Sequence, residues 1–178
     1  LLAVGAISPR KGYDVLIRAL APLRELDWRL TIVGATDRDP ATVAALEQAI
    51  SDTGLRDHVT LAGKVVPATL ARHYDSADVF VLPSLFEGYG MVLAEAMAHG
   101  LPIVTTTGGA AAETVPDEAA LKVPPGEVDP LGAALVRVIS DRKLRKRLEA
   151  ASWEAGRKLP TWTETARRVF AVIMDMKV

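Results

Sequence analysis

The stretch of sequence that decides the fold reads PSLFEGYGMVLAEAMAHGLP and covers residues 83–102. The apolar run just before it, residues 79–82, has the length and residue types of a strand buried on both faces. Pro83 ends that strand because proline donates no ladder hydrogen bond. A glycine-containing loop and a short helix follow, and Gly100 stops the helix before the next strand. We therefore expect the loop to open at the carboxyl end of a buried strand.

The start of this helix has the features of an anion site. In an open parallel α/β sheet, ligands bind at the carboxyl ends of the strands, and the following helix directs unpaired N–H groups and its positive dipole end toward them. Gly88 and Gly90 let the backbone approach a ligand closely. The backbone amides that we expect to face a phosphate belong to Gly90, Met91 and Val92.

Two carboxylates lie near the expected anion site. Glu87 is in the loop and Glu95 is about one turn into the helix, so both can face the expected anion site at the carboxyl end of the strand. Because carboxylates repel an anion, we expect them to bind something else, and sugar hydroxyls are suitable partners. A nucleotide diphosphate sugar carries both groups. The alternative is that the two acids only place negative charge near a helix N-terminus, which stabilises by about 0.3–1 kcal/mol.

These residues resemble a known signature. The pattern Pro-Ser-x-x-Glu-Gly-x-Gly-x-x-x-x-Glu-Ala-x-Ala-x-Gly-x-Pro, which contains Glu-x7-Glu, resembles that of the family-4 retaining glycosyltransferases, in the C-terminal domain of the GT-B fold. The resemblance covers nearly the whole chain. It implies that Glu95 holds the ribose hydroxyls of a nucleotide donor. It also implies that Glu87, the residue assigned to catalysis, contacts the donor sugar near the reacting carbon.

A second expected anion site is the basic loop that follows the first expected strand, residues 1–4. Arg10 offers a bidentate guanidinium and Lys11 a point charge, and both suit a diphosphate, although an exposed basic turn is the alternative. The family usually has an Arg where this chain has Ala6, and its Lys-Gly element is matched by Lys11 and Gly12. The resemblance therefore places Lys11 on the donor diphosphate, with Arg10 supplying the missing charge from a neighbouring position.

Two further loops take their expected roles from the resemblance. In the family, the loop after the third strand lies against the nucleotide base, and here it contains Gly63, Lys64 and Val65. A glycine pair borders the sugar site, and Gly108 and Gly109 occupy that place here. The alternative for the glycine pair is a plain turn.

Strands alternate with helices along the chain, which predicts an α/β fold. We expect a Rossmann-like three-layer α/β/α sandwich with a doubly wound, mostly parallel sheet of about six strands, as in one half of a GT-B fold. The expected strands cover residues 1–4, 28–34, 58–63, 79–82, 101–105 and 119–123. Besides the short central helix, the expected helices cover residues 13–26, 40–53, 67–74, 130–140, 141–158 and 161–178.

The chain divides into two predicted parts. Residues 1–160 form the nucleotide-sugar donor-binding domain, and the C-terminal helix 161–178 crosses toward an N-terminal acceptor domain that this sequence lacks. Phe170, Ile173 and Met174 then pack on that domain or, alternatively, cover the sheet of this one. Because the sequence opens directly into a strand without Met or a basic leader, we expect an excised domain or part of a longer protein.

Composition limits the partners. The 178 residues carry a formal net charge of -1, so no general attraction to nucleic acid is expected. The chain has no cysteine, which excludes disulfides and thiolate zinc sites and fits a reducing cytoplasm. No apolar run is long enough to span a bilayer. We expect a cytoplasmic protein, peripheral to the membrane only through the missing domain.

No cofactor or metal is expected. His58, His73 and His99 share no metal-ligand spacing and have no serine or cysteine partner, so we interpret them as ordinary. The substrate is a nucleotide-diphosphate sugar, with UDP as the expected nucleotide. The acceptor is a lipid, sugar or polysaccharide held by the missing N-terminal domain, so this chain alone should bind donor weakly and transfer nothing.

The resulting hypothesis is the donor-binding half of a retaining glycosyltransferase. The alternatives are a glycoside phosphorylase or a nucleotide-sugar epimerase on the same fold, and a non-catalytic nucleotide-binding module. Epimerases resemble GT-B proteins in fold but not in the Glu-x7-Glu context. A phosphorylase would need free phosphate for turnover, and a pure binding module is favoured if nucleotide gives no protection against heat.

Overall fold

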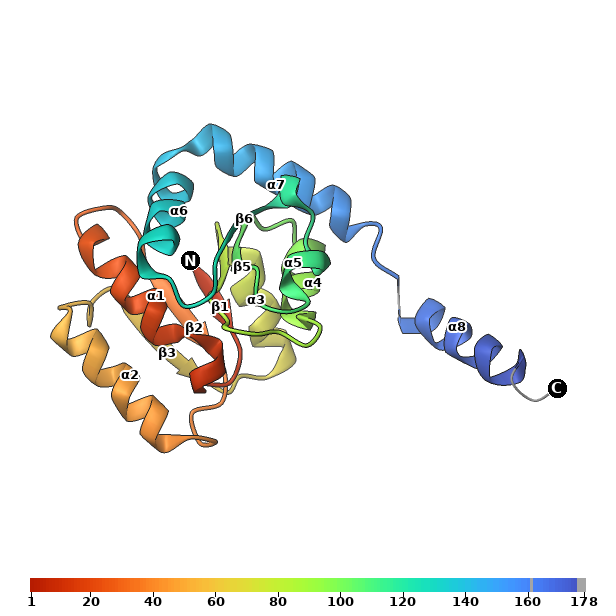
Figure 1. Cartoon of the computed structure of the whole chain (residues 1–178), viewed down its shortest axis with the longest axis horizontal. Helices are drawn as coiled ribbons and strands as arrows, with labels where there is room; N and C mark the ends of the chain where they lie inside the picture. The colour runs from red at the N-terminus through yellow and green to blue at the C-terminus, as the bar shows by residue number, and fades with distance from the viewer. Residues whose placement is uncertain (161, 176–178) are drawn as a thin grey trace.

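The computed structural model describes residues 1–160 and 162–175 (Figure 1). Six strands form a single sheet in the order β3-β2-β1-β4-β5-β6. All of its pairings are parallel. The strands are β1 Leu2–Val4, β2 Leu30–Val33, β3 Val59–Gly63, β4 Phe80–Leu82, β5 Ile103–Thr106 and β6 Ala120–Val123. The order reverses between β1 and β4, and the expected doubly wound sheet is confirmed.

Helices cover both faces of the sheet. Their bounds are α1 Tyr13–Leu20, α2 Pro40–Asp52, α3 Pro67–Ser76, α4 Met91–Ala98, α5 Ala111–Thr114, α6 Val128–Ser140, α7 Arg142–Gly156 and α8 Trp162–Asp175. Three short 3-10 turns are η1 Pro9–Lys11, η2 Ala21–Leu23 and η3 Asp117–Ala119. Helices α1, α2 and α6 pack on one face, and α3, α4 and α5 on the other, which gives the three layers.

The strands are buried on both faces. Ala3, Val81 and Val104 lie in the core that contains α1 and α6. Their strand neighbours, such as Phe80 and Ile103, lie in the core that contains α4. Because successive side chains of a strand point to opposite faces, a strand covered on both sides must be apolar throughout. This is the physical reason for the continuous apolar runs.

One helix boundary was predicted wrongly. We expected the first helix to reach about residue 26, but α1 ends at Leu20 and the chain continues as the 3-10 turn η2. Pro22 lies in that turn, and a proline inside a helix removes one backbone hydrogen bond and clashes with the carbonyl four residues earlier. The apolar spacing continues past Leu20, but the backbone cannot follow it as an α-helix.

The last helix stands apart from the rest of the protein (Figure 1). Phe170, Ile173 and Met174 on α8 are 63%, 48% and 49% exposed, so the alternative that they cover this domain's sheet is wrong. The predicted helix 161–178 includes residues 161 and 176–178, which lie outside the described residues. Its role as a crossover stays a prediction.

Within the part of the chain that the structure describes, no helix combines the length and the apolar character needed to cross a membrane.

Candidate functional site

The candidate site lies where the sheet changes direction. Strands β1 and β4 are neighbours, and the helices that follow them pack on opposite faces. The loops after the two strands are therefore drawn apart above the sheet, which creates the crevice where open α/β sheets bind ligands. The Leu85 N–H donates to the Arg10 carbonyl at 2.8 Å and ties the two loops together. Both loops carry residues that the sequence singled out.

A buried ion pair joins these loops. Lys11 Nζ donates to Glu87 Oε1 at 2.7 Å, and the two residues are 7% and 6% exposed. The Ser84 hydroxyl donates to the same oxygen at 2.6 Å. Arg10 lies farther out, with its NH1 at 3.2 Å from that oxygen. All three contacts are made to Glu87 Oε1. The described residues make no such contact to the other carboxylate oxygen of Glu87, Oε2, so this oxygen is available to a ligand.

The contacts with Lys11, Ser84 and Arg10 stabilise the ionised form of the Glu87 carboxyl. Burial on its own raises the pKa of the Glu87 carboxyl, but hydrogen bonds from Lys11 and Ser84 and the charges of Lys11 and Arg10 outweigh it. The pKa of Glu87 is therefore lowered from its ordinary value. The residue is an anion at neutral pH and acts as a hydrogen-bond acceptor, not as a proton donor.

The basic loop after β1 is not an exposed turn. Lys11 is buried, which rules out that alternative for the lysine. The half-exposed Arg10 side chain turns toward the β4 loop, where NH1 donates to the Phe86 carbonyl at 2.6 Å. The guanidinium therefore sits at the mouth of the crevice, although Ala6 occupies the place where the family usually has an arginine.

Helix α4 begins at the crevice, directly after Gly90. Met91 at its start is 51% exposed. The first amides of a helix have no acceptor within the helix, so those of Met91 and Val92 can serve an external anion. Thr114 Oγ1 donates to the Tyr89 carbonyl at 2.7 Å and fastens the loop just before the helix.

The second predicted carboxylate makes a separate contact. Glu95 in α4 accepts a 2.8 Å hydrogen bond at Oε2 from the hydroxyl of Tyr74 in α3. Glu95 is not hydrogen-bonded to Lys11 or Glu87. The structure therefore brings Lys11, Arg10 and Glu87 together and leaves Glu95 in a separate pair with the tyrosine. Sequence reasoning missed Tyr74 because the contact crosses between two helices. It also missed Ser84, although the spacing of three residues to Glu87 within one loop was a usable signal.

The glycine pair supports the backbone of Glu87. The Glu87 N–H donates to the Gly108 carbonyl at 3.1 Å, and the Ala110 N–H donates to the Glu87 carbonyl at 2.8 Å. Gly109 has a φ of 67° and lies so close that a Cβ there would come within 2.4 Å of the Glu87 carbonyl oxygen. The Gly108 N–H donates to Thr106 Oγ1 at 3.3 Å, so this amide already has a partner within the protein.

The loop expected near the base lies farther along the sheet. Gly63 ends β3, which is separated from β1 by β2. Lys64 is exposed and binds Asp37, with 2.6 Å between Nζ and Oδ2. The hydrogen bond from Lys64 is the largest cause of a lowered pKa at Asp37. Val65 is partly buried against the core on the α3 and α4 side.

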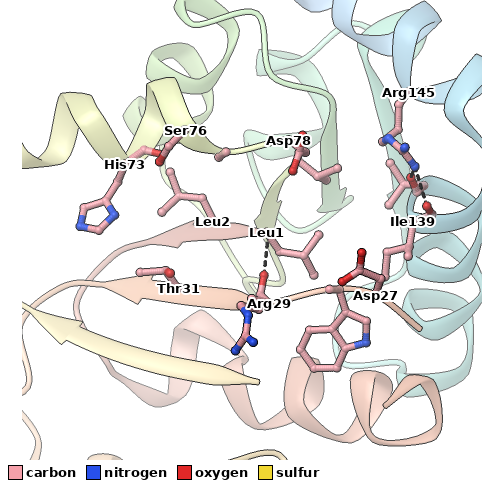
Figure 2. Close-up of a pocket in the computed structure, with 14 residues that line it drawn as sticks. Leu1, Leu2, Asp27, Arg29, Thr31, His73, Ser76, Asp78, Ile139 and Arg145 are labelled. Carbon is pink, nitrogen blue, oxygen red and sulfur yellow. Dashed lines mark hydrogen bonds between the residues drawn. The ribbon is translucent and has the colours of Figure 1, made fainter. Parts of the chain in front are cut away.

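A hollow of about 470 Å³ lies on the opposite edge of the sheet and is shown in Figure 2. The side chains of Arg29, Thr31, His73 and Asp78 line it, from the amino ends of the strands and from α3. Arg145 there directs its guanidinium to the Ile139 carbonyl. Because ligands of open parallel sheets bind at the carboxyl ends of the strands, we do not assign the site to this hollow.

Two of the three histidines make ordinary contacts within the protein. His58 Nδ1 lies 3.1 Å from the Trp28 carbonyl oxygen, and His99 Nδ1 lies 2.9 Å from Asp75 Oδ1. Among the described residues, no group of three or more His, Cys, Asp and Glu side chains is arranged to hold a metal ion.

Fold and site together define a Rossmann-like α/β domain with a buried lysine–glutamate ion pair at its switch point. Residues 1–141 match the family of glycosyl transferases group 1, and the chain belongs to this family. Mannosylfructose-phosphate synthase of Agrobacterium fabrum is 33% identical over 180 residues, which cover 97% of this chain and 40% of that protein. The chain spans about two fifths of the length of the curated relatives that it matches first.

Solved structures agree with this assignment. Sucrose-phosphate synthase from Thermosynechococcus elongatus superposes with a TM-score of 0.87 at 29% identity, covering 98% of this chain and 45% of that one. The C-terminal domain of the group 1 glycosyl transferase LpcC from Francisella tularensis gives a TM-score of 0.78 at 28% identity, covering 86% of this chain and 82% of that domain. The predicted family, GT-B fold and C-terminal position are confirmed.

Proposed function

We propose that this chain is the donor-binding half of a retaining glycosyltransferase, which transfers a sugar from a nucleotide-diphosphate sugar to an acceptor. The observation that carries the proposal is the buried Lys11–Glu87 pair at the switch point, beside the start of α4. The pair places a cation and a carboxylate next to each other, where a donor presents its diphosphate and its sugar hydroxyls. Family membership supports the same reaction class.

The leaving diphosphate is stabilised by three positive groups. These groups are Lys11, Arg10 and the first amides of α4, and they lie around the crevice at the switch point. Preorganised charges of this kind favour a transition state in which negative charge develops. These groups supply the charge compensation that the diphosphate needs, so the proposed reaction uses no metal ion and no cofactor. The donor nucleotide is UDP in this proposal.

The sugar is oriented by Glu87. Its ionised carboxylate accepts hydrogen bonds from sugar hydroxyls through the oxygen that Lys11 and Ser84 leave available, and its negative charge favours an oxocarbenium-like carbon. We assign no nucleophilic carboxylate. As the family resemblance implies, the acceptor attacks the face from which the diphosphate leaves, the leaving phosphate takes the acceptor proton, and the anomeric configuration is retained.

The other contacts follow the same scheme. Glu95 holds the ribose, the loop with Gly63, Lys64 and Val65 borders the base, and the glycine pair closes the sugar side. Helix α8 leads to an acceptor-binding domain, which holds a lipid, sugar or polysaccharide and makes any membrane contact. The protein works in the cytoplasm in this proposal, which the absence of cysteine from the sequence supports.

Thermal unfolding of the chain with UDP, GDP, ADP and their sugar conjugates tests the donor role. A nucleotide at about 100 times its Kd should add about 2.7 kcal/mol to the stability and raise Tm by several degrees. Lys11→Ala and Glu95→Ala should abolish the shift. Lys143→Ala, which removes an exposed lysine of α7, is the matched control and should keep it.

Two results would contradict the proposal. A Tm that responds to no nucleotide excludes the donor-binding role, and a shift that survives both Lys11→Ala and Glu95→Ala places the nucleotide elsewhere. Sugar transfer by the 178-residue chain alone would overturn the expectation that the acceptor domain is required.

A further inference from the structure

Glu95 is held by a single buried tyrosine. The Tyr74 hydroxyl donates to Glu95 Oε2 at 2.8 Å, and Tyr74 is 2% exposed whereas Glu95 is partly exposed. The described residues make no other side-chain hydrogen bond to this carboxylate. Its orientation therefore depends on where the phenol is placed.

The phenol is placed by its ring and not by the hydrogen bond. Tyr74 stacks on Phe80 of β4 with 5.8 Å between ring centroids and 26° between planes. On another side it stacks on His99 at 5.0 Å and 12°. These aromatic contacts do not depend on the hydroxyl. The packed ring therefore holds the hydroxyl, a single hydrogen-bond donor, at a fixed position beside Glu95.

Both side chains lean toward the edge of the sheet that carries the candidate site. Helices α3 and α4 each follow a strand, β3 and β4, so each begins at the carboxyl ends of the strands. Long side chains of a helix point toward its N-terminus. The hydroxyl of Tyr74 and the carboxylate of Glu95 therefore form their hydrogen bond on the side of their helices that faces the crevice.

The donor and acceptor roles in this pair are fixed. Burial raises the pKa of Tyr74, and its hydrogen bond to Glu95 raises it further, so the phenol keeps its proton at physiological pH. The hydroxyl can then only donate to the carboxylate. With Oε2 fixed in this way, Oε1 and the remaining lone pair of Oε2 can accept hydrogen bonds from two neighbouring hydroxyls.

We infer that Tyr74 is a positioning residue for ribose recognition, which fixes the Glu95 carboxylate so that it accepts both ribose hydroxyls of the donor nucleotide. The inference rests on the proposed function, because it needs a nucleotide at this site. Tyr74 itself does not touch the donor. Its effect reaches the ligand only through Glu95.

Tyr74→Phe tests the inference, because it removes the hydroxyl and keeps both ring contacts. Titration calorimetry on the chain should compare UDP, GDP and ADP with the 2′,3′-dideoxy form of the nucleotide that binds. For the ribose nucleotide we expect Tyr74→Phe to raise Kd about three- to tenfold, the range of one hydrogen bond. For the dideoxy nucleotide, wild type and variant should bind equally.

Tyr13→Phe is the matched control. It removes another buried tyrosine hydroxyl, which donates to the Gly5 carbonyl and not to a carboxylate. Any change that Tyr13→Phe causes in Kd should be the same for the ribose and the dideoxy nucleotide. A change that depends on the ribose hydroxyls is expected of Tyr74→Phe alone.

The outcomes separate this inference from the proposed function. If the wild type binds a nucleotide and Glu95→Ala weakens binding, but Tyr74→Phe does not, the positioning role is wrong. If Tyr74→Phe weakens the ribose and dideoxy forms equally, its role is structural and the inference is overturned. If the wild type binds no nucleotide, the proposed function fails and this inference fails with it.

Discussion

Lys11 and Glu87 are 76 positions apart in the sequence, yet Nζ and Oε1 lie 2.7 Å from each other in a buried ion pair. The pair bridges the two loops at the switch point of the sheet. It also means that the lysine which we assign to the diphosphate is already in contact with the carboxylate which we assign to the sugar. A bound donor would therefore share Lys11 with Glu87.

Glu87→Ala should destabilise the protein. Removing one partner of a buried ion pair leaves the other charge uncompensated, so we expect the free energy of unfolding to fall by about 3 kcal/mol. Urea denaturation measures the change. Adding Lys11→Met to this variant removes the uncompensated charge and should recover at least about 1 kcal/mol. A double variant as unstable as the sum of the single losses would contradict this account.

Acid should weaken the contribution of Glu87. Because the folded-state pKa of Glu87 is lowered, the carboxylate stabilises the fold above its unfolded-state pKa, and this stability is lost as the pH falls through the lowered value. The difference in unfolding free energy between wild type and Glu87→Gln should be constant near neutral pH and shrink in the acidic range. Urea denaturation from pH 7 to about 3 covers the ordinary glutamate pKa of about 4.3. A difference that grows toward acid pH would show the opposite sign.

Ser84→Ala should cost stability that an equally buried serine does not. The Ser84 hydroxyl donates to the ionised Glu87, and a hydrogen bond to a charged group contributes about 1.5–3 kcal/mol. Ser152 is also fully buried, but its hydroxyl has no hydrogen-bond partner among the described residues. Ser152→Ala should therefore be close to neutral. In Ser84→Ala the pKa of Glu87, followed by NMR, should move toward its ordinary value, and equal effects of the two variants on stability would refute the assignment.

Gly109→Ala should disrupt the site more than a glycine change elsewhere. A Cβ at Gly109 would come within 2.4 Å of the Glu87 carbonyl oxygen, and the left-handed backbone adds strain of about 1–2 kcal/mol. Gly54 has a similar φ of 70°, but nothing lies within 4 Å of an added Cβ. Gly54→Ala therefore isolates the backbone strain. Urea denaturation should show a clearly larger loss for Gly109→Ala, and equal losses would mean that the contact with Glu87 relaxes freely.

The sequence predicted the fold well because strand burial is a local property. Apolar runs such as that ending at Leu82 report a strand covered on both faces, and the glycines and prolines between the runs mark the turns. The end of α1 was misplaced because apolar spacing was followed past Pro22. The sequence did not predict which surface Phe170 on α8 packs against, because a helical apolar face looks the same whether it covers its own sheet or another domain.

The residues of the candidate site were named from the sequence, but the contacts between them were not predicted. Glu87, Glu95 and Lys11 were named from their motifs, which are local. That Lys11 binds Glu87 depends on the pairing of β1 with β4, and no pattern within either loop contains that information. Tyr74 could not be distinguished from an ordinary core aromatic, because its one polar contact lies on a different helix.

The pairing of β1 with β4 also bears on how the protein folds. The site exists only after two segments far apart in the sequence have docked, and such non-local pairing forms late because the loop-closure entropy must be overcome first. A partly folded chain with only β1, β2 and β3 assembled would have Lys11 but no partner for it. Formation of the Lys11–Glu87 contact during refolding would therefore report that both halves of the sheet have joined.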